Sequence, residues 1–131
     1  MKKTAIICLA LLMCMATVFA GGSTEKSAEK TTYNVGICQF VQHVALDAAT
    51  QGFEDAITDA LGKDKVSFNY QNASADMATV TTIINSLVSD KVDLILANAT
   101  PPLQSAAAAT DTIPILGTSI TDYATALGMP L

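Results

Sequence analysis

Short apolar runs alternate with longer amphipathic stretches from Tyr33 onward. The run at residues 33–38 is compact and β-prone, which predicts a strand. Across residues 44–61, apolar positions recur every three or four residues, the spacing of one helix face. Gly62 then stands where helices commonly end. The pattern therefore opens with a strand followed by a helix.

The same alternation continues to the end of the chain. Thr100 is the expected N-cap of one of these helices, with Pro101 at the first helical position, where its missing N–H is no loss. The remaining predicted elements, in chain order, are a strand at 66–71, a helix with its apolar stripe between 77 and 88, a strand at 92–97, a helix at 100–109, a strand at 113–117, a turn at 118–122 and a helical start at 123–127.

Strands separated by helices of this length indicate parallel pairing with right-handed crossovers and helices on both faces. The predicted fold class is therefore α/β, with a parallel doubly wound sheet. Such a sheet can be completed in about five strands, and only four are predicted here. We therefore expect a truncated lobe in which the fourth strand keeps a free edge.

The first 32 residues have a different pattern. Lys2 and Lys3 precede an apolar run that ends in small residues near Ala20, the layout of a secretory signal at residues 1–20. Residues 21–32 have the composition of a flexible linker, which leaves 33–131 as the globular body. The interpretation is an exported protein, periplasmic or at the cell surface, with an uncleaved amino-terminal anchor as the alternative.

Composition narrows the range of partners. Removal of residues 1–20 takes away two lysines and no acid, leaving 5 basic and 12 acidic residues, a formal charge of −7. This balance, without any basic cluster, argues against nucleic acid as a partner. Cys38 is the one cysteine beyond the signal, so the body contains no intramolecular disulfide.

Candidate chemistry lies where the strands end, because ligands of open α/β sheets bind outside the carboxyl ends of the strands. Those segments are rich in amides and hydroxyls and poor in charge, which suits a small ligand held by helix N-termini. Phe40 and Tyr123 could add an apolar wall. The same polar residues are also ordinary helix caps, so both interpretations stay open at each position.

Enzyme chemistry has weaker support. The first strand is followed by neither a dinucleotide nor a phosphate-loop motif, and no spacing of ligands indicates a metal. Cys38, His43 and Asp47 could form a nucleophile, base and orienting acid. The favoured interpretation is a small buried hydrophobe, a hydrogen-bonding residue at the cleft edge and a first-turn acid. No catalytic residue, cofactor or metal is therefore expected.

Three stretches resemble a known family: VGICQFVQHVALDAATQGFEDAI, DKVDLILANATPPLQSAAAAT and IPILGTSITDY. Together they are similar to the substrate-binding proteins of ABC transporters of the tryptophan/tyrosine type. The resemblance covers 33–127 and implies a periplasmic-binding-protein-like fold of two lobes closing on a small ligand. This chain would be the amino-terminal lobe, truncated before the second.

The resemblance also implies site residues, partners and a function. It implies capture of a small organic solute, with an aromatic amino acid as the leading candidate, for an ABC permease in the membrane. Thr100, Thr118 and Ser119 would meet a ligand carboxylate, and Gln39 and Asn98 would be polar anchors. The full set of implied ligand-binding residues is Gln39, Phe40, His43, Asn98, Ala99, Thr100, Thr118, Ser119 and Asp122. The alternatives are an exported flavodoxin-like enzyme and a non-functional truncated remnant.

Overall fold

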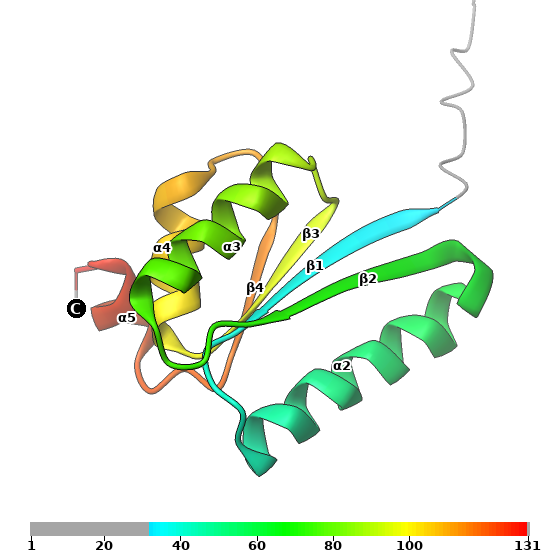
Figure 1. Cartoon of the computed structure of the whole chain (residues 1–131), viewed down its shortest axis with the longest axis horizontal. Helices are drawn as coiled ribbons and strands as arrows, with labels where there is room; N and C mark the ends of the chain where they lie inside the picture. Colours follow the sequence, from blue (N-terminus) through cyan, green and yellow to red (C-terminus); the bar gives the residue numbers. More distant parts are fainter. Residues whose placement is uncertain (1–31, 131) are drawn as a thin grey trace, which may run out of the picture.

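The computed structural model describes residues 32–130, which form a four-stranded sheet with helices on both sides (Figure 1). The predicted signal and all but the last residue of the predicted linker lie outside the described residues. The elements are β1 (Tyr33–Gln39), α2 (Val44–Leu61), the short 3-10 helix η1 (Lys63–Lys65), β2 (Val66–Asn72), α3 (Met77–Ser89), β3 (Leu94–Asn98), α4 (Thr100–Ala109), β4 (Ile115–Thr118) and α5 (Tyr123–Leu127). The predicted order is confirmed, although β3 and β4 each begin two residues later than predicted.

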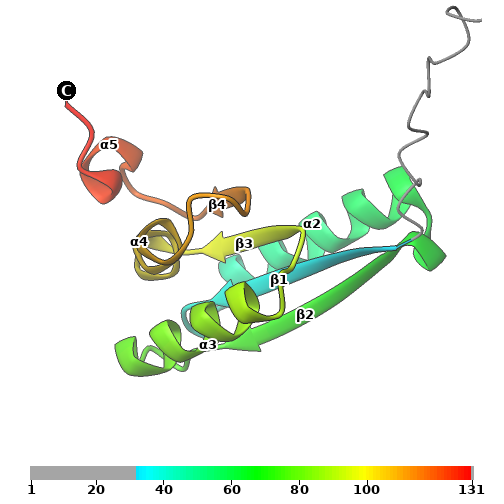
Figure 2. The ribbon, with the colours of Figure 1, turned by 90° about the horizontal axis from the view of Figure 1, so that it is seen from above.

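All four strands are parallel and lie in the order β2-β1-β3-β4. The chain moves outward from β1 to β2, then crosses over β1 to β3 and continues to β4. This reversal confirms the predicted α/β class with a parallel doubly wound sheet. Because the strands are parallel, their carboxyl ends lie at one edge of the sheet (Figure 2).

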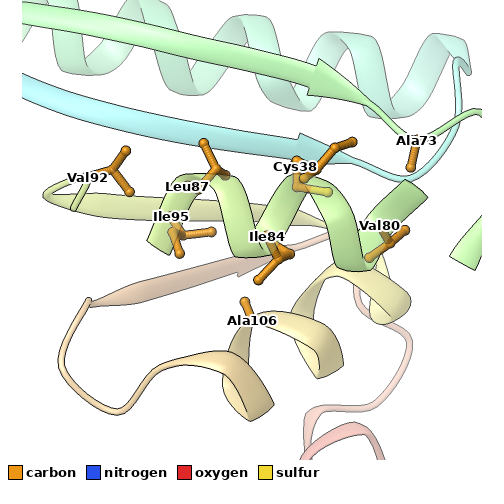
Figure 3. Packing of buried hydrophobic residues seen from close by; sticks show 9 residues of the cluster. Cys38, Ala73, Val80, Ile84, Leu87, Val92, Ile95 and Ala106 are labelled. Carbon is orange, nitrogen blue, oxygen red and sulfur yellow. The ribbon is translucent and has the colours of Figure 1, made fainter. Parts of the chain in front are cut away.

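One face of the sheet packs against α3 and α4. Side chains from both helices and from the sheet form the largest buried cluster (Figure 3). Gly36 of β1 lets α3 approach closely, because a Cβ at this position would lie 2.7 Å from Cδ2 of Leu87. The buried members of the cluster are Cys38, Ala73, Val80, Ile83, Ile84, Leu87, Val92, Ile95 and Ala106.

The other face of the sheet is covered by α2. Val35, Ile37 and Leu96 form its buried cluster, and the rings of Phe53 and Phe68 meet edge to face with centroids 6.4 Å apart. The apolar stripe predicted for this helix is wider than the one that is buried. Apolar residues in the middle of α2, such as Ala48 and Ala56, are exposed as well as those at its ends.

Two consequences of this packing concern α2 itself. Val44, at its first position, is 84% exposed, although the sequence pattern placed it on the buried face. The buried residue of α2 is instead a polar one, Thr50. Among residues 32–130, no helix combines the length and the apolar character that crossing a membrane would require.

Candidate ligand-binding site

The last residue of every strand is polar, and the register places all four side by side. Gln39 pairs with Asn72 on one side and with Asn98 on the other, and Asn98 pairs with Thr118. We call Asn72, Gln39, Asn98 and Thr118 the strand-end row. The order of the strands reverses between β1 and β3, the point at which ligands bind to doubly wound sheets. Gln39 and Asn98, the two predicted polar anchors, lie there.

Gln39 and Asn98 are fully buried and bonded to α2. The Gln39 amide Nε2 donates to Oδ1 of Asp47 at 2.6 Å and to the carbonyl of Val41 at 3.0 Å. Asn98 Nδ2 donates to the carbonyl of Leu46 at 2.8 Å and to Oγ1 of Thr50 at 2.9 Å. These contacts tie the ends of β1 and β3 to the first half of α2. Both side chains are therefore held inside the lobe.

The loop from β1 to α2 carries Phe40 and His43. The backbone N–H of Phe40 donates to the carbonyl of Asn98 at 3.1 Å, and its half-buried ring packs against the cluster under α3. His43 is exposed and is the N-cap of α2, with Nδ1 accepting from the N–H of Ala45 at 3.2 Å. The side chain of His43 therefore caps a helix at the rim of the strand-end row.

The start of α4 differs from the prediction. The N-cap is Ala99, so Thr100 is the first helical residue and Pro101 the second. Thr100 was wrongly predicted as the cap, because the N–H of Ala99 donates to the carbonyl of Thr118 at 3.0 Å and so places the helix start one residue earlier. Ala99 has φ 111° and ψ 164°, a region almost confined to glycine.

Only a few N–H groups are available at the start of α4. A helix normally leaves its first four N–H groups without intrahelical partners. Here Pro101 and Pro102 carry none, and Leu103 N donates to the carbonyl of Ala99 at 3.3 Å. Over residues 100–103, a ligand would therefore find the N–H and hydroxyl of Thr100 rather than a full turn of donors.

The segment after β4 supplies three further predicted residues. Thr118 ends β4 beside Asn98, and Ser119 follows it with φ 57° in the left-handed region. Asp122 is the N-cap of α5 and accepts from the N–H groups of Ala124 and Thr125. Hydrogen bonding from the Thr125 side chain holds the pKa of Asp122 below its usual value. The carboxylate of Asp122 is thus engaged in capping.

Two hollows lie beside the end of β2, and a third of about 440 Å³ lies between α3 and α4. One of about 420 Å³ is lined by both acidic and amide side chains of α2, and burial together with repulsion from Asp55 raises the pKa of one of them, Glu54. A neighbouring hollow of about 520 Å³ is lined by Val41, Gln42, Tyr70, Asn72 and Ser74. The lining of the first is Gln39, Gln42, Asp47, Thr50, Gln51, Glu54 and Tyr70.

The possible thiol triad is not assembled. Cys38 points into the cluster under α3, while its neighbour Gln39 points toward α2. Burial raises the pKa of the Cys38 thiol to about 12, the opposite of an activated nucleophile. Asp47 is bonded to Gln39, and His43 Nδ1 accepts from a backbone N–H. Within residues 32–130 there is no group of three or more His, Cys, Asp or Glu that could hold a metal.

A parallel doubly wound sheet with neutral polar residues along its carboxyl edge defines one lobe of a periplasmic-binding-protein fold. The chain belongs to the ABC transporter substrate binding protein family, whose model matches residues 34–128. This is a family of binding proteins.

Three relatives place the chain within this family. A tyrosine-binding protein of Clostridioides difficile is 43% identical over 105 residues, which are 79% of this chain and 30% of that protein. The ligand-free, open structure of a substrate-binding protein with adhesive properties from Clostridium difficile matches with a TM-score of 0.70 at 42% identity, over 72% of this chain and 33% of that one. An ABC domain from Streptococcus pneumoniae in complex with L-Trp matches with a TM-score of 0.69 at 33% identity, over 72% of this chain and 32% of that one. The chain thus spans about a third of the length of these relatives.

Sequence reasoning missed two residues that organise the site. Thr50 was not singled out, and Asp47 was interpreted as a first-turn acid of the helix, yet both bond to Gln39. A signal for Thr50 was present: it lies four residues after Leu46 and three before Phe53, within the apolar stripe. A hydroxyl in such a stripe requires a buried partner. The predicted direct contacts of the nine site residues with a ligand remain a prediction.

Proposed function

We propose that this chain provides one wall of the ligand site of an extracytoplasmic solute-binding protein, and that the ligand is a free aromatic amino acid. The observation that carries the proposal is the strand-end row at the point where the sheet order reverses. The tyrosine-binding protein of Clostridioides difficile and the ABC domain in complex with L-Trp, each over 30% identical to this chain, support this choice of ligand. The partner that would receive the solute is an ABC permease in the membrane.

The polar groups at the carboxyl ends of β3 and β4 suit an amino acid carboxylate. Thr100 offers an N–H and a hydroxyl at the positive end of α4, and Thr118 and Ser119 follow the adjacent strand. No arginine occurs anywhere in the chain, so neutral donors would carry this contact. Tyr123, 46% exposed and hydrogen-bonded to the carbonyl of Gly117 at 2.6 Å, is a fixed aromatic surface nearby.

The test is thermal unfolding and calorimetric titration of the chain with L-tyrosine, L-tryptophan and L-phenylalanine, with L-aspartate as the control ligand. A ligand present at 100 times its Kd stabilises a binder by about 2.7 kcal/mol, which raises the Tm by several degrees. We expect that shift with at least one aromatic amino acid and none with L-aspartate. Equal shifts with all four, or none with any, would contradict the proposal.

A matched pair of variants tests where the carboxylate binds. Thr100→Val removes the hydroxyl at the start of α4 and should weaken aromatic amino acid binding about tenfold, the effect of losing one hydrogen bond to a charged group. Thr82→Val makes the same change on the exposed side of α3, where the hydroxyl bonds only to the carbonyl of Ala78. Its affinity should equal that of the wild type. Equal affinity of both variants would remove Thr100 from the site.

A further inference from the structure

One hydroxyl connects the two strand ends at the centre of the row. Thr50 Oγ1 donates to Oε1 of Gln39 at 2.8 Å and accepts from Nδ2 of Asn98 at 2.9 Å. Thr50 is 6% exposed, and Gln39 and Asn98 are 0% exposed, so these three groups meet inside the lobe. A hydroxyl can donate and accept at once, and no apolar side chain of this size can replace it.

Asp47, at one end of this chain of hydrogen bonds, fixes which group donates and which accepts. The carboxylate of Asp47 can only accept, so Gln39 must present Nε2 to it, and Oε1 is then left for Thr50. Thr50 consequently donates to Gln39 and offers its lone pair to Asn98. Asn98 keeps this orientation although its buried Oδ1 has no partner among the described residues. The reverse orientation would set Oδ1 against the carbonyl of Leu46, two acceptors facing each other.

Asn98 in turn fixes the start of α4. Its carbonyl accepts from Phe40 N, and its side chain is held by Thr50 and by the carbonyl of Leu46. The next residue, Ala99, has the backbone angles of a strained position, and Thr100 follows directly. Strained backbone persists only where its surroundings over-determine it. The bonds to Asn98 and the bond from Ala99 N to Thr118 O provide that constraint.

We propose that Thr50 is a positioning residue for ligand binding: its hydroxyl orients Asn98 and thereby sets where Thr100 presents its N–H and hydroxyl. The proposal rests on the proposed function, because it concerns the same strand-end site. It also assigns Gln39 and Asn98 to support of the site from within, since neither exposes any surface to a ligand. Asp47 belongs to the same group through its bond to Gln39.

The test compares four forms of the full chain by calorimetric titration with L-tyrosine and L-tryptophan. Thr50→Val keeps the shape and removes the hydroxyl, and we expect it to weaken binding at least tenfold. Thr50→Ser restores the hydroxyl and should bind within about threefold of wild type. Ile83→Val, in the cluster under α3, is the stability control: it should lower the Tm and leave affinity unchanged.

A second pair keeps the test decisive if Thr50→Val does not fold. Asp47→Ala removes the carboxylate that accepts from Gln39. Asp47 is half-buried and therefore packed less tightly than the buried Thr50, so this variant disturbs the packing less. It should weaken binding, whereas Asp47→Asn, which retains an acceptor oxygen, should recover most of the affinity. Amide hydrogen exchange at Ala99, whose N–H donates to the carbonyl of Thr118, should become faster in Thr50→Val and Asp47→Ala and remain unchanged in Ile83→Val.

Two different results would overturn the proposal, and they are distinguishable. A folded Thr50→Val or Asp47→Ala variant that binds within twofold of wild type, with unchanged exchange at Ala99, would remove the positioning role and leave the proposed function intact. A wild-type chain that binds neither amino acid would overturn the proposed function, and the positioning role with it.

Discussion

At the scale of single residues, Ala99 is the most unusual position in the described chain. Its φ of 111° and ψ of 164° lie where a Cβ is poorly tolerated, and such positions cost about 1–3 kcal/mol. The strain is held at the junction of β3 and α4 by hydrogen bonds on either side. Local strain of this kind is concentrated at ligand sites, which agrees with the place of Ala99 beside Thr100.

Replacement of Ala99 by glycine should relieve this strain. We expect Ala99→Gly to raise the free energy of unfolding by about 1 kcal/mol, because the gain at a positive φ exceeds the added entropy of the unfolded chain. Ala107→Gly, at an exposed position within α4, should lower it by a similar amount. Urea denaturation of the two variants measures the sign of each change in the free energy of unfolding. A loss of stability in both would show that the backbone at Ala99 is unstrained.

At the scale of elements, replacing glycine by alanine should change the stability of the fold in opposite directions at two positions. Gly36 in β1 faces Leu87 of α3 so closely that an added Cβ would lie 2.7 Å from it, whereas Gly52 in α2 has nothing within 4 Å of such an atom. Gly36→Ala should destabilise the chain by about 1–3 kcal/mol through overpacking. Gly52→Ala should stabilise it by about 0.5–1 kcal/mol through helix propensity. Chemical denaturation would measure both, and equal effects would contradict this account of the β1–α3 contact.

The elements were predictable, but their local contacts were less so. Alternation of apolar runs and amphipathic stretches indicated every strand and α-helix, though not the short helix η1, because burial on both faces of a parallel sheet leaves a strong pattern. The cap of α4 was not predictable from Thr100 and Pro101, since a long-range bond between Ala99 and Thr118 decides where that helix begins. The place of Thr50 in the apolar stripe indicated a buried partner, but not which one, because its partners lie 11 and 48 residues away in sequence.

At the scale of the whole molecule, two capping carboxylates make the stability of the fold depend on pH. Asp76 and Asp122 cap α3 and α5, and hydrogen bonds from Thr79 and Thr125 hold the pKa of each carboxyl group below its usual value. A carboxyl group with a lowered folded pKa stabilises the fold above its unfolded pKa, and this stabilisation is lost as the pH falls through the folded value. The Tm should therefore fall as the pH is lowered from about 5 into the range below 3.8.

Variants separate this acid response from general unfolding. The double change Asp76→Asn and Asp122→Asn keeps an acceptor at both caps and should make the fall of Tm between pH 5 and about pH 3 shallower. The charge of Glu54 has the opposite effect on stability. Burial, and then repulsion from Asp55, raise the pKa of this carboxyl group above its usual value, so its ionised form destabilises the fold. Glu54→Gln should raise the Tm at neutral pH and have no effect once Glu54 is protonated. Scanning calorimetry across pH measures both, and an unchanged acid slope in the double variant would contradict the role of the caps.

The alternation along β1 has a consequence for how the site forms during folding. Gly36 and Cys38 face α3, while Val35, Ile37 and Gln39 face α2. A slip of the strand by one residue would bring the Gln39 amide into the apolar layer under α3 and leave Thr50 opposite a thiol. Both faces would then carry unsatisfied polar groups. The strand-end row therefore favours the native alignment, because a sheet shifted by one residue cannot bring these four polar residues side by side.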